Sequence, residues 1–579
     1  MNDIISILSR EGVLDDKIAA RARQAMAEGQ SLDDALRMPG NGDGVGAVPE
    51  DKLLRWLADY FHIPYVDLES AAPSKELLTR FPVRLLLKHH LLPLKEEADG
   101  VLVATSRVFD TSALDELRVS AGVEVRPALA PLSEIDRAAK RLLGVGADTL
   151  QSMGVNEEEV TVIEQSDDDL DLTSVTAAAQ DASIIRFVNQ VMAEALELRA
   201  TDVHVEPFEN QLRVRYRVDG VLQEANIPPQ VRKFHAAIVS RLKILSHLDI
   251  AEKRLPQDGR IRLKVAGREI DLRVSVIPMI HGEAVVLRIL DRGDTLLGLE
   301  HLGFSRRDRI AWERVIELPH GIILVTGPTG SGKTTTLYAA LSRINSIDQK
   351  IVTIEDPVEY QLRGINQIQV NTKSGLTFGA GLRSILRHDP DVILIGEIRD
   401  RETADIAVQS SLTGHLVFST LHTNDAPGAV TRLIDMGIEP YLVASTLEMV
   451  AAQRLVRLIC KHCKAPAPPQ DREVMLAAGV KNVPEIFRGK GCRQCLGTGY
   501  RGRQGVFELM PVTDEIRALT IERSSARAIR NVAVKQGMSS LREDGWRLIA
   551  EGRTTVEEVV RLTKDETASV GTESLGMAV

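Results

Sequence analysis

Hydrophobic residues recur with helical spacing over two segments near the N-terminus, Asp3–Glu28 and Glu50–Phe61. Further along, short apolar runs at Leu91–Lys95 and Val101–Ala104 predict strands. Helices followed by short strands are typical of a small mixed domain. We therefore expect residues 1–145 to form an α/β unit.

A different pattern follows in residues 182–300. Ser183–Leu198 has the spacing of an amphipathic helix. Leu212–Val218 alternates apolar and charged residues with period two, and Ile270–Val276 and Ala284–Leu290 are further candidate strands. The pattern predicts a curved antiparallel sheet with helices on one face.

The third region, residues 301–515, contains strands that are apolar throughout rather than alternating. These runs are Ile322–Thr326, Ile351–Ile354, Val392–Ile395 and Leu416–Thr420. Helical patterns separate them, which indicates a parallel sheet buried on both faces. Residues 516–565 are expected to be helical, and 566–579 to form a flexible tail.

Composition limits the functional classes. The chain has 579 residues, too many for one core, and its net charge of −10 equals the ten acidic residues found without Lys or Arg between Leu142 and Ile185. Residues 146–181 are therefore predicted to be an acidic, disordered linker. The rest is nearly neutral and only 4% of all residues are aromatic, which argues against nucleic acid as a partner. No run is long and apolar enough to span a bilayer or to form a secretory signal, so a cytoplasmic chain is expected.

The strongest chemical motif follows the first apolar strand of the third region. It fits the pattern G-x-x-x-x-G-K-[ST], in which glycines let backbone N–H groups surround phosphates at the positive end of a helix. The lysine reaches the β- and γ-phosphates of ATP, and the hydroxyl after it can bind Mg²⁺. The expected nucleotide-binding residues are Gly327, Pro328, Thr329, Gly330, Ser331, Gly332, Lys333 and Thr334.

Two acidic residues end neighbouring apolar strands, where ligands bind in doubly wound sheets. Glu397 suits the Mg²⁺ side of the site, together with Thr334, and Glu355 suits the water that attacks the phosphate. These roles could be exchanged, and either residue could be an ordinary surface acid. His415 and His422 flank the fourth strand, where a histidine can contact the γ-phosphate or serve only the structure.

All four cysteines form two C-x-x-C pairs separated by 28 residues. This spacing predicts a closed, structural Zn²⁺ site made by Cys460, Cys463, Cys492 and Cys495. Redox chemistry of the thiol pairs is the alternative. His462 is a less favoured ligand.

Several arginines are candidates for stabilising phosphate charge, from the same subunit or a neighbour: Arg273, Arg288, Arg383, Arg387 and Arg399. Spacing alone favours a surface or ion-pair role for each. The alternating Arg213, Arg215 and Arg217 are interpreted as a solvated strand face rather than a nucleic-acid contact.

Taken together, the quoted motifs resemble a known family. Several segments are similar to the secretion ATPases of type II secretion and type IV pilus systems. They are Arg199–Pro207, Ile354–Glu359, Leu386–Asp391, Gly396–Asp400 and the phosphate-binding loop (P-loop) Gly327–Thr334. The likeness covers about residues 182–565. Three features most resemble the general secretory pathway protein E branch of this family: Gly364–Val370, Thr413–Ile438 and the cysteine pairs.

The resemblance implies a RecA-like P-loop NTPase core with a zinc-knuckle insertion at 457–500, preceded by a PAS-like domain at 182–300. It implies a homo-hexamer that hydrolyses MgATP to drive pseudopilus assembly and protein export. Its partners would be inner-membrane platform and cytoplasmic-anchor proteins, with residues 1–145 for docking or regulation and with attachment to the inner membrane through these partners. A type IV pilus extension ATPase is the alternative with the same chemistry. A DNA-transport motor lacks support from composition, and a non-hydrolysing scaffold would lack the lysine or an acid.

Residue roles also follow from the resemblance. Arg273 and Arg288 would close over the nucleotide, Glu397 would be the Walker B acid, and Glu355 would lie in the aspartate box. Residues 1–70, ending in Phe61–Leu68, resemble a domain that binds cyclic di-GMP in some relatives. The glycine-rich insertion near Gly40 and a missing Arg-Leu-Gly pattern argue against such binding here.

Overall fold

The computed structural model describes residues 2–28, 31–33, 50–68, 73, 75–97, 99–143, 182–265, 268–291, 297–480 and 483–563. It divides into two compact units, Met1–Asp291 and Arg292–Val579. The expected acidic linker, the tail and the glycine-rich insertion near Gly40 lie outside the described residues.

The N-terminal part of the first unit is mixed α/β, as expected. The predicted helical segment Asp3–Glu28 is two helices, because Gly12 takes a positive φ of 71° between them. Its helices are α1 (Asn2–Arg10), α2 (Asp16–Ala27), α4 (Glu50–Phe61), α5 (Lys75–Thr79), α6 (Val83–Lys88), α7 (Ser112–Ala121) and α8 (Leu132–Leu143). Its sheet is ordered β1 (Leu92–Glu97), β2 (Gly100–Thr105), β3 (Val125–Leu129). The third strand was not predicted.

Residues 182–291 form an antiparallel sheet with helices on one face. The strands run β6 (Val221–Glu224), β5 (Leu212–Val218), β4 (Ala200–Pro207), β9 (Gly282–Asp291), β8 (Arg268–Met279), β7 (Gln257–Val265) across the sheet. Helices α11 (Ala182–Glu197) and α12 (His235–Leu245), with the short 3-10 helix η1 (Pro229–Phe234), complete it. Val203 and Val205 share one core with residues of both helices, so alternation places Asp202 and His204 on the opposite face.

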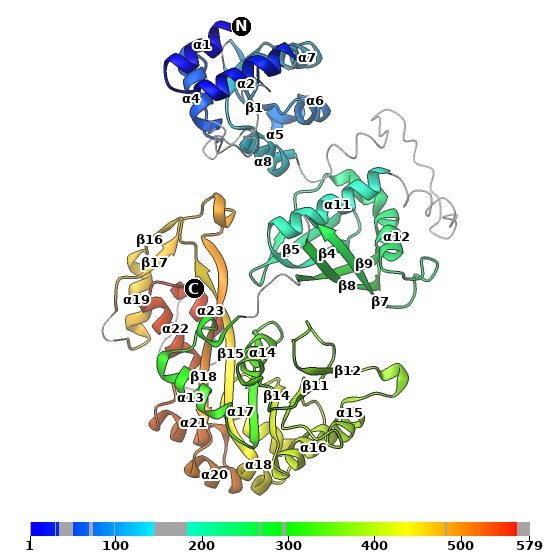
Figure 1. Ribbon diagram of the computed structural model, residues 1–579, viewed down its shortest axis with the longest axis vertical. Helices are drawn as coiled ribbons and strands as arrows, with labels where there is room; N and C mark the ends of the chain where they lie inside the picture. The colour runs from blue at the N-terminus through cyan, green and yellow to red at the C-terminus, as the bar shows by residue number, and fades with distance from the viewer. Residues whose placement is uncertain are drawn as a thin grey trace, which may run out of the picture. The chain divides into compact units, whose positions relative to one another are not determined.

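The second unit is built on a sheet of seven strands ordered β12-β11-β13-β14-β10-β15-β18 (Figure 1). The predicted parallel strands are β10 (Gly321–Thr326), β11 (Ile351–Glu355), β13 (Val392–Ile395) and β14 (Leu416–Leu421), joined by β12 (Asn366–Gln369). Alternate residues of β10 belong to different cores, Ile322 and Leu324 to one and Ile323 and Val325 to the other. The sheet is therefore buried on both faces, as the apolar runs predicted.

Helices cover this sheet. They are α13 (Arg306–Val315), α14 (Lys333–Ile344), α15 (Phe378–Ile385), α16 (Arg401–Leu412), α17 (Ala426–Asp435) and α18 (Pro440–Thr446), with short 3-10 helices η2 (Leu299–His301) and η3 (Thr372–Ser374). The expected C-terminal helices are α20 (Asp514–Ile521), α21 (Ala526–Lys535), α22 (Leu541–Ala550) and α23 (Val556–Leu562).

Two long strands extend the sheet beyond what the sequence predicted. β15 (Leu447–Ile459) runs parallel to β10 and pairs antiparallel with β18 (Tyr500–Pro511). The cysteine segments lie between these two strands, with β16 (Lys464–Pro466), α19 (Pro469–Ala477), β17 (Phe487–Gly489) and the 3-10 helix η4 (Arg493–Cys495). The insertion is therefore carried by a long hairpin at one edge of the core.

Candidate active site and cysteine cluster

The P-loop connects β10 to the N-terminus of α14. Gly332 precedes this helix with a φ of 90°, and no side chain caps the helix. The first N–H groups of α14 are thus available to an anion at the positive end of the helix dipole. A Cβ on Gly327 would lie 2.5 Å from the carbonyl oxygen of Gln453, so only glycine permits this close approach.

Two P-loop side chains indicate that the cradle is built for phosphate. Lys333 Nζ donates to the carbonyl oxygens of Gly327 at 2.8 Å and Pro328 at 3.0 Å, which are neutral partners. Burial lowers the pKa of Lys333, with Glu397 opposing and Arg454 adding to the shift. Ser331 Oγ is buried and has no hydrogen-bond partner in the described part of the chain. A phosphate would give Lys333 the negatively charged partner that it lacks, so these residues fit a nucleoside triphosphate.

Glu397 follows β13 and is held by two basic side chains. Its carboxylate pairs with Arg399, and its Oε2 lies 3.0 Å from His422 Nε2. Burial raises the pKa of Glu397, but the hydrogen bonds from Arg399 and His422 outweigh burial and leave the pKa below its ordinary value. Glu397 is thus ionised at neutral pH, as a Mg²⁺ ligand must be.

Glu355 ends the neighbouring strand β11 and is 4% exposed. The Tyr338 hydroxyl donates to its Oε2, while Thr353 Oγ1 (2.6 Å) and Gln367 Nε2 (3.2 Å) donate to its Oε1. Tyr338 belongs to α14, so Glu355 is tied to the helix that begins at the P-loop. Its carboxylate is fixed by neutral donors, unlike that of Glu397.

The sheet order brings most of the predicted residues to one edge. β14 lies between β10 and β13, so His422 at its carboxyl end stands between the P-loop and Glu397. Ile354 pairs with Ile395, and the Gly396 N–H donates to the Ile354 carbonyl at 2.8 Å, which brings the two strand ends together. This edge is where a doubly wound sheet binds its ligand.

Three predicted candidates lie elsewhere in the second unit. His415 precedes β14 at its amino end, at the other end of the strand from His422, and its Nδ1 lies 2.9 Å from the Ser410 carbonyl oxygen, which favours the structural alternative. Arg383 pairs with Glu402, and Arg387 donates to the Arg383 carbonyl at 2.9 Å. Of the candidate arginines in this unit, only Arg399 contacts the site.

Arg273 and Arg288 belong to the first unit, where they face each other across β8 and β9. The register continues this row through Arg260 on β7, Asp202 on β4 and Arg217 on β5. Asp202 accepts from Arg288 Nε at 3.0 Å and lies 3.5 Å from Arg217 Nε. Four arginines and one carboxylate thus share a row, and arginine side chains are suited to binding phosphate.

The other two alternating arginines, interpreted above as part of a solvated face, are paired with acidic residues of the same sheet. Arg215 makes a two-pronged contact with Glu206 at 2.7 and 2.8 Å, and Arg213 lies 3.5 Å from Glu224. Their charge is therefore compensated within the sheet.

The four cysteines come together. Their Sγ atoms all lie within 4.8 Å of one another, and three of the separations are 3.7 to 3.8 Å. A Zn²⁺ ion with four sulfur ligands at about 2.3 Å requires sulfurs about 3.8 Å apart. Backbone N–H groups of Cys492 and Gly499 donate to Cys495 Sγ and, against the effect of burial, bring its pKa to about 7. The geometry is compatible with zinc, and the exposed His462 is not part of the cluster.

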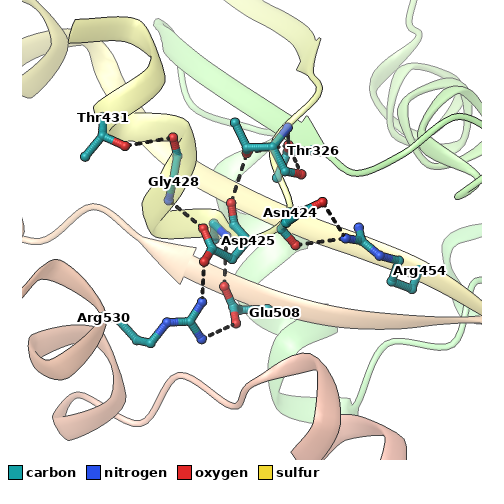
Figure 2. A network of polar contacts seen from close by, with 10 residues as sticks. Thr326, Asn424, Asp425, Gly428, Thr431, Arg454, Glu508 and Arg530 are labelled. Atoms are coloured by element: carbon teal, nitrogen blue, oxygen red, sulfur yellow. Dashed lines mark hydrogen bonds and ion pairs between the residues drawn. The ribbon is translucent and has the colours of Figure 1, made fainter. Parts of the chain in front are cut away.

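Sequence reasoning missed a second layer of polar residues behind the P-loop (Figure 2). Arg454 interrupts the buried strand β15 and donates to the carbonyl and side-chain oxygens of Asn424 at 3.1 and 3.2 Å. Glu508, on β18, is 0% exposed. A charged residue inside an apolar run was the available signal in both cases.

The strand order, the P-loop and the two strand-end acids define a P-loop NTPase with a RecA-like core. A family model described as Type II/IV secretion system protein matches residues 177–561, and an MshEN domain model matches 61–148. The chain belongs to the type II/IV secretion system protein family. The MshEN match begins at Phe61. The sequence resemblance to a domain that binds cyclic di-GMP in some relatives was expected over residues 1–70 instead.

Curated relatives agree with this assignment. The chain is 44% identical over 574 residues to type II secretion system protein E of Xanthomonas campestris, covering 97% of this chain and 98% of the relative. It is 54% identical over 387 residues to the protein of the same name in Pseudomonas aeruginosa, covering 67% and 76%. It is 43% identical over 521 residues to the type IV pilus assembly ATPase PilB of Myxococcus xanthus, covering 89% and 91%. The protein is thus a secretion ATPase, an ATP-hydrolysing enzyme, as the sequence predicted.

Proposed function

We propose that this protein is a homo-hexameric motor that hydrolyses MgATP to drive pseudopilus assembly and protein export by a type II secretion system. The observation that carries the proposal is similarity over nearly the full length of a type II secretion system protein E, combined with an intact P-loop and two strand-end acids. Its partners would be inner-membrane platform and cytoplasmic-anchor proteins, at which the cytoplasmic chain acts peripherally. Among the described helices, none has the length and apolar sequence needed to cross a bilayer.

The site residues divide the chemistry. Bound Mg²⁺ would neutralise charge on the β- and γ-phosphates, and Thr334 and Glu397 would hold the ion. Lys333 would exchange its two carbonyl partners for phosphate oxygens. Glu355 would orient the attacking water once Tyr338 shares or releases its carboxylate. His422 would contact the γ-phosphate while its ring holds Glu397 in place.

Supply of positive charge from the first unit completes the proposal. Arg273 and Arg288, in the row described above, would close over the nucleotide and offset charge that develops during phosphoryl transfer. The cysteine cluster would hold a structural Zn²⁺.

The deciding experiment replaces Lys333→Ala on the chromosome of the source bacterium and scores the extracellular proteome and surface pili together. Loss of secreted proteins with pili intact is the expected result. Arg343→Ala, an exposed residue of the same helix, is the matched control and should leave both unchanged.

A type IV pilus extension ATPase is the second candidate, favoured by the 43% identity to the Myxococcus relative. Loss of pili with secretion intact in the same experiment would select it instead. If a strain that produces the variant at normal levels keeps both its secretion and its pili, both functions are contradicted.

A further inference from the structure

The loop that carries His422 is clamped from both sides. Residues 422–425 join β14 to α17, so the loop leads from His422 into a helix. On one side, Thr326, the last residue before the P-loop, accepts the N–H of Thr423 at 2.8 Å and lies 2.7 Å from its hydroxyl. Asn424 is held by Arg454, whose guanidinium also lies beside Gly327.

The other side of the loop is held by strand β18 and helix α21 (Figure 2). Asp425 caps α17 through the Gly428 N–H at 2.7 Å and accepts from Arg530 Nη2 at 2.6 Å. Glu508 Oε1 accepts the Ala426 N–H at 2.8 Å, and its Oε2 accepts from Arg530 Nη1 at 3.1 Å. One guanidinium of α21 thus joins the carboxylate of the loop residue Asp425 to that of Glu508, which accepts the N–H of the next residue, Ala426.

We propose that Arg530 is a positioning residue for ATP hydrolysis, which fixes the loop of His422 through Asp425 and Glu508 and couples helix α21 to the nucleotide site. The bridge requires a planar fork with two N–H directions, which arginine has and lysine lacks. Glu508 is fully buried, so its ion pair with Arg530 has one well-defined geometry. A shift of α21 must therefore move the loop, and with it the imidazole beside Glu397.

The proposal rests on the hydrolytic site assigned above, and its test separates the two. Arg530→Gln should lower kcat for ATP roughly 10-fold while changing the Kd for ATP less than about twofold, because its carboxylate partners, Asp425 and Glu508, lie outside the P-loop. Arg530→Lys keeps the charge beside Glu508, so it should fold normally, yet lose the two-pronged bridge and about as much kcat. Arg527→Gln, exposed on the same helix, should behave as wild type.

A double-mutant cycle tests whether Arg530 acts through His422. In a His422→Ala background, Arg530→Lys should cost little further activity, because the imidazole it positions is gone. If the kcat losses of the two single variants multiply in the double variant, or if Arg530→Lys leaves kcat unchanged, the proposal is overturned. Hydrolysis that survives Lys333→Ala would instead overturn the site itself, whatever Arg530 does.

Discussion

At the scale of single residues, the site depends on opposed effects at Glu397. Burial favours the neutral acid, whereas Arg399 and His422 favour the carboxylate and prevail, so the pKa of Glu397 in the folded chain is below its ordinary value. Such a group contributes stability above its unfolded pKa, and this contribution is lost as pH falls through the lower, folded pKa. The carboxylate is therefore available to a metal ion across the neutral range.

Removing Arg399 should reverse this balance. In Arg399→Gln, burial acts against one hydrogen bond instead of two, so the pKa of Glu397 rises. We expect the acid limb of the pH profile of kcat/KM for ATP to move to higher pH. Arg401→Gln, which removes an exposed ion pair with Asp405, is the matched control. Superimposable profiles for Arg399→Gln and wild type would contradict the assignment of Arg399 to the site.

A second residue-scale prediction concerns the two acids. Glu397→Gln should reduce ATP turnover by about 100-fold or more, since the ion loses a charged ligand, while nucleotide binding falls much less. Binding of a fluorescent ATP analogue and phosphate release, measured on one preparation, separate the two effects. Turnover within twofold of wild type would exclude Glu397 as the magnesium ligand.

At the scale of elements, the sequence pattern predicted the strands and helices that are determined by residues close together in the chain. The apolar runs that became β10, β11, β13 and β14 are buried on both faces, and the P-loop had its strand before and its helix after. β15 was missed because its apolar run is interrupted by Gln453 and Arg454, whose partners lie far away in sequence. Likewise, no spacing rule links Arg530 to Asp425, 105 residues apart. Long-range polar contacts are fixed by tertiary packing, which the sequence pattern does not display.

The cysteine hairpin is one element whose stability can be tested alone. Cys463→Ser should reduce bound zinc from about one ion per chain to nearly none and lower the unfolding midpoint by several degrees, about 4 °C or more. Because β15 and β18 also pair along the core sheet, amide exchange should rise mainly in residues 460–500 and ATP binding should persist. His462→Ala, exposed beside the cluster, should retain zinc. A well-folded wild-type protein without zinc would refute the metal site.

At the scale of the whole molecule, the arginine row and the P-loop belong to different units of one chain. In a ring of identical subunits, each nucleotide could receive its arginines from its own chain or from a neighbour. The row on β7, β8, β9, β4 and β5 contains Arg273 and Arg288, the two arginines proposed to close over the nucleotide. Mixing two inactive variants distinguishes the alternatives.

Lys333→Ala lacks a working P-loop but keeps the row, and Arg273→Ala has the converse defect. If the arginines act between subunits, an equal mixture that exchanges subunits has a competent pair at about one interface in four, and hydrolysis should recover to about a quarter of wild type. If they act within a chain, every working P-loop lacks Arg273 and no activity returns. A mixture of Lys333→Ala with the double variant Lys333→Ala/Arg273→Ala is the control and should stay inactive. We expect recovery, because in a ring each nucleotide lies beside a neighbouring chain that can supply its arginines to the phosphates.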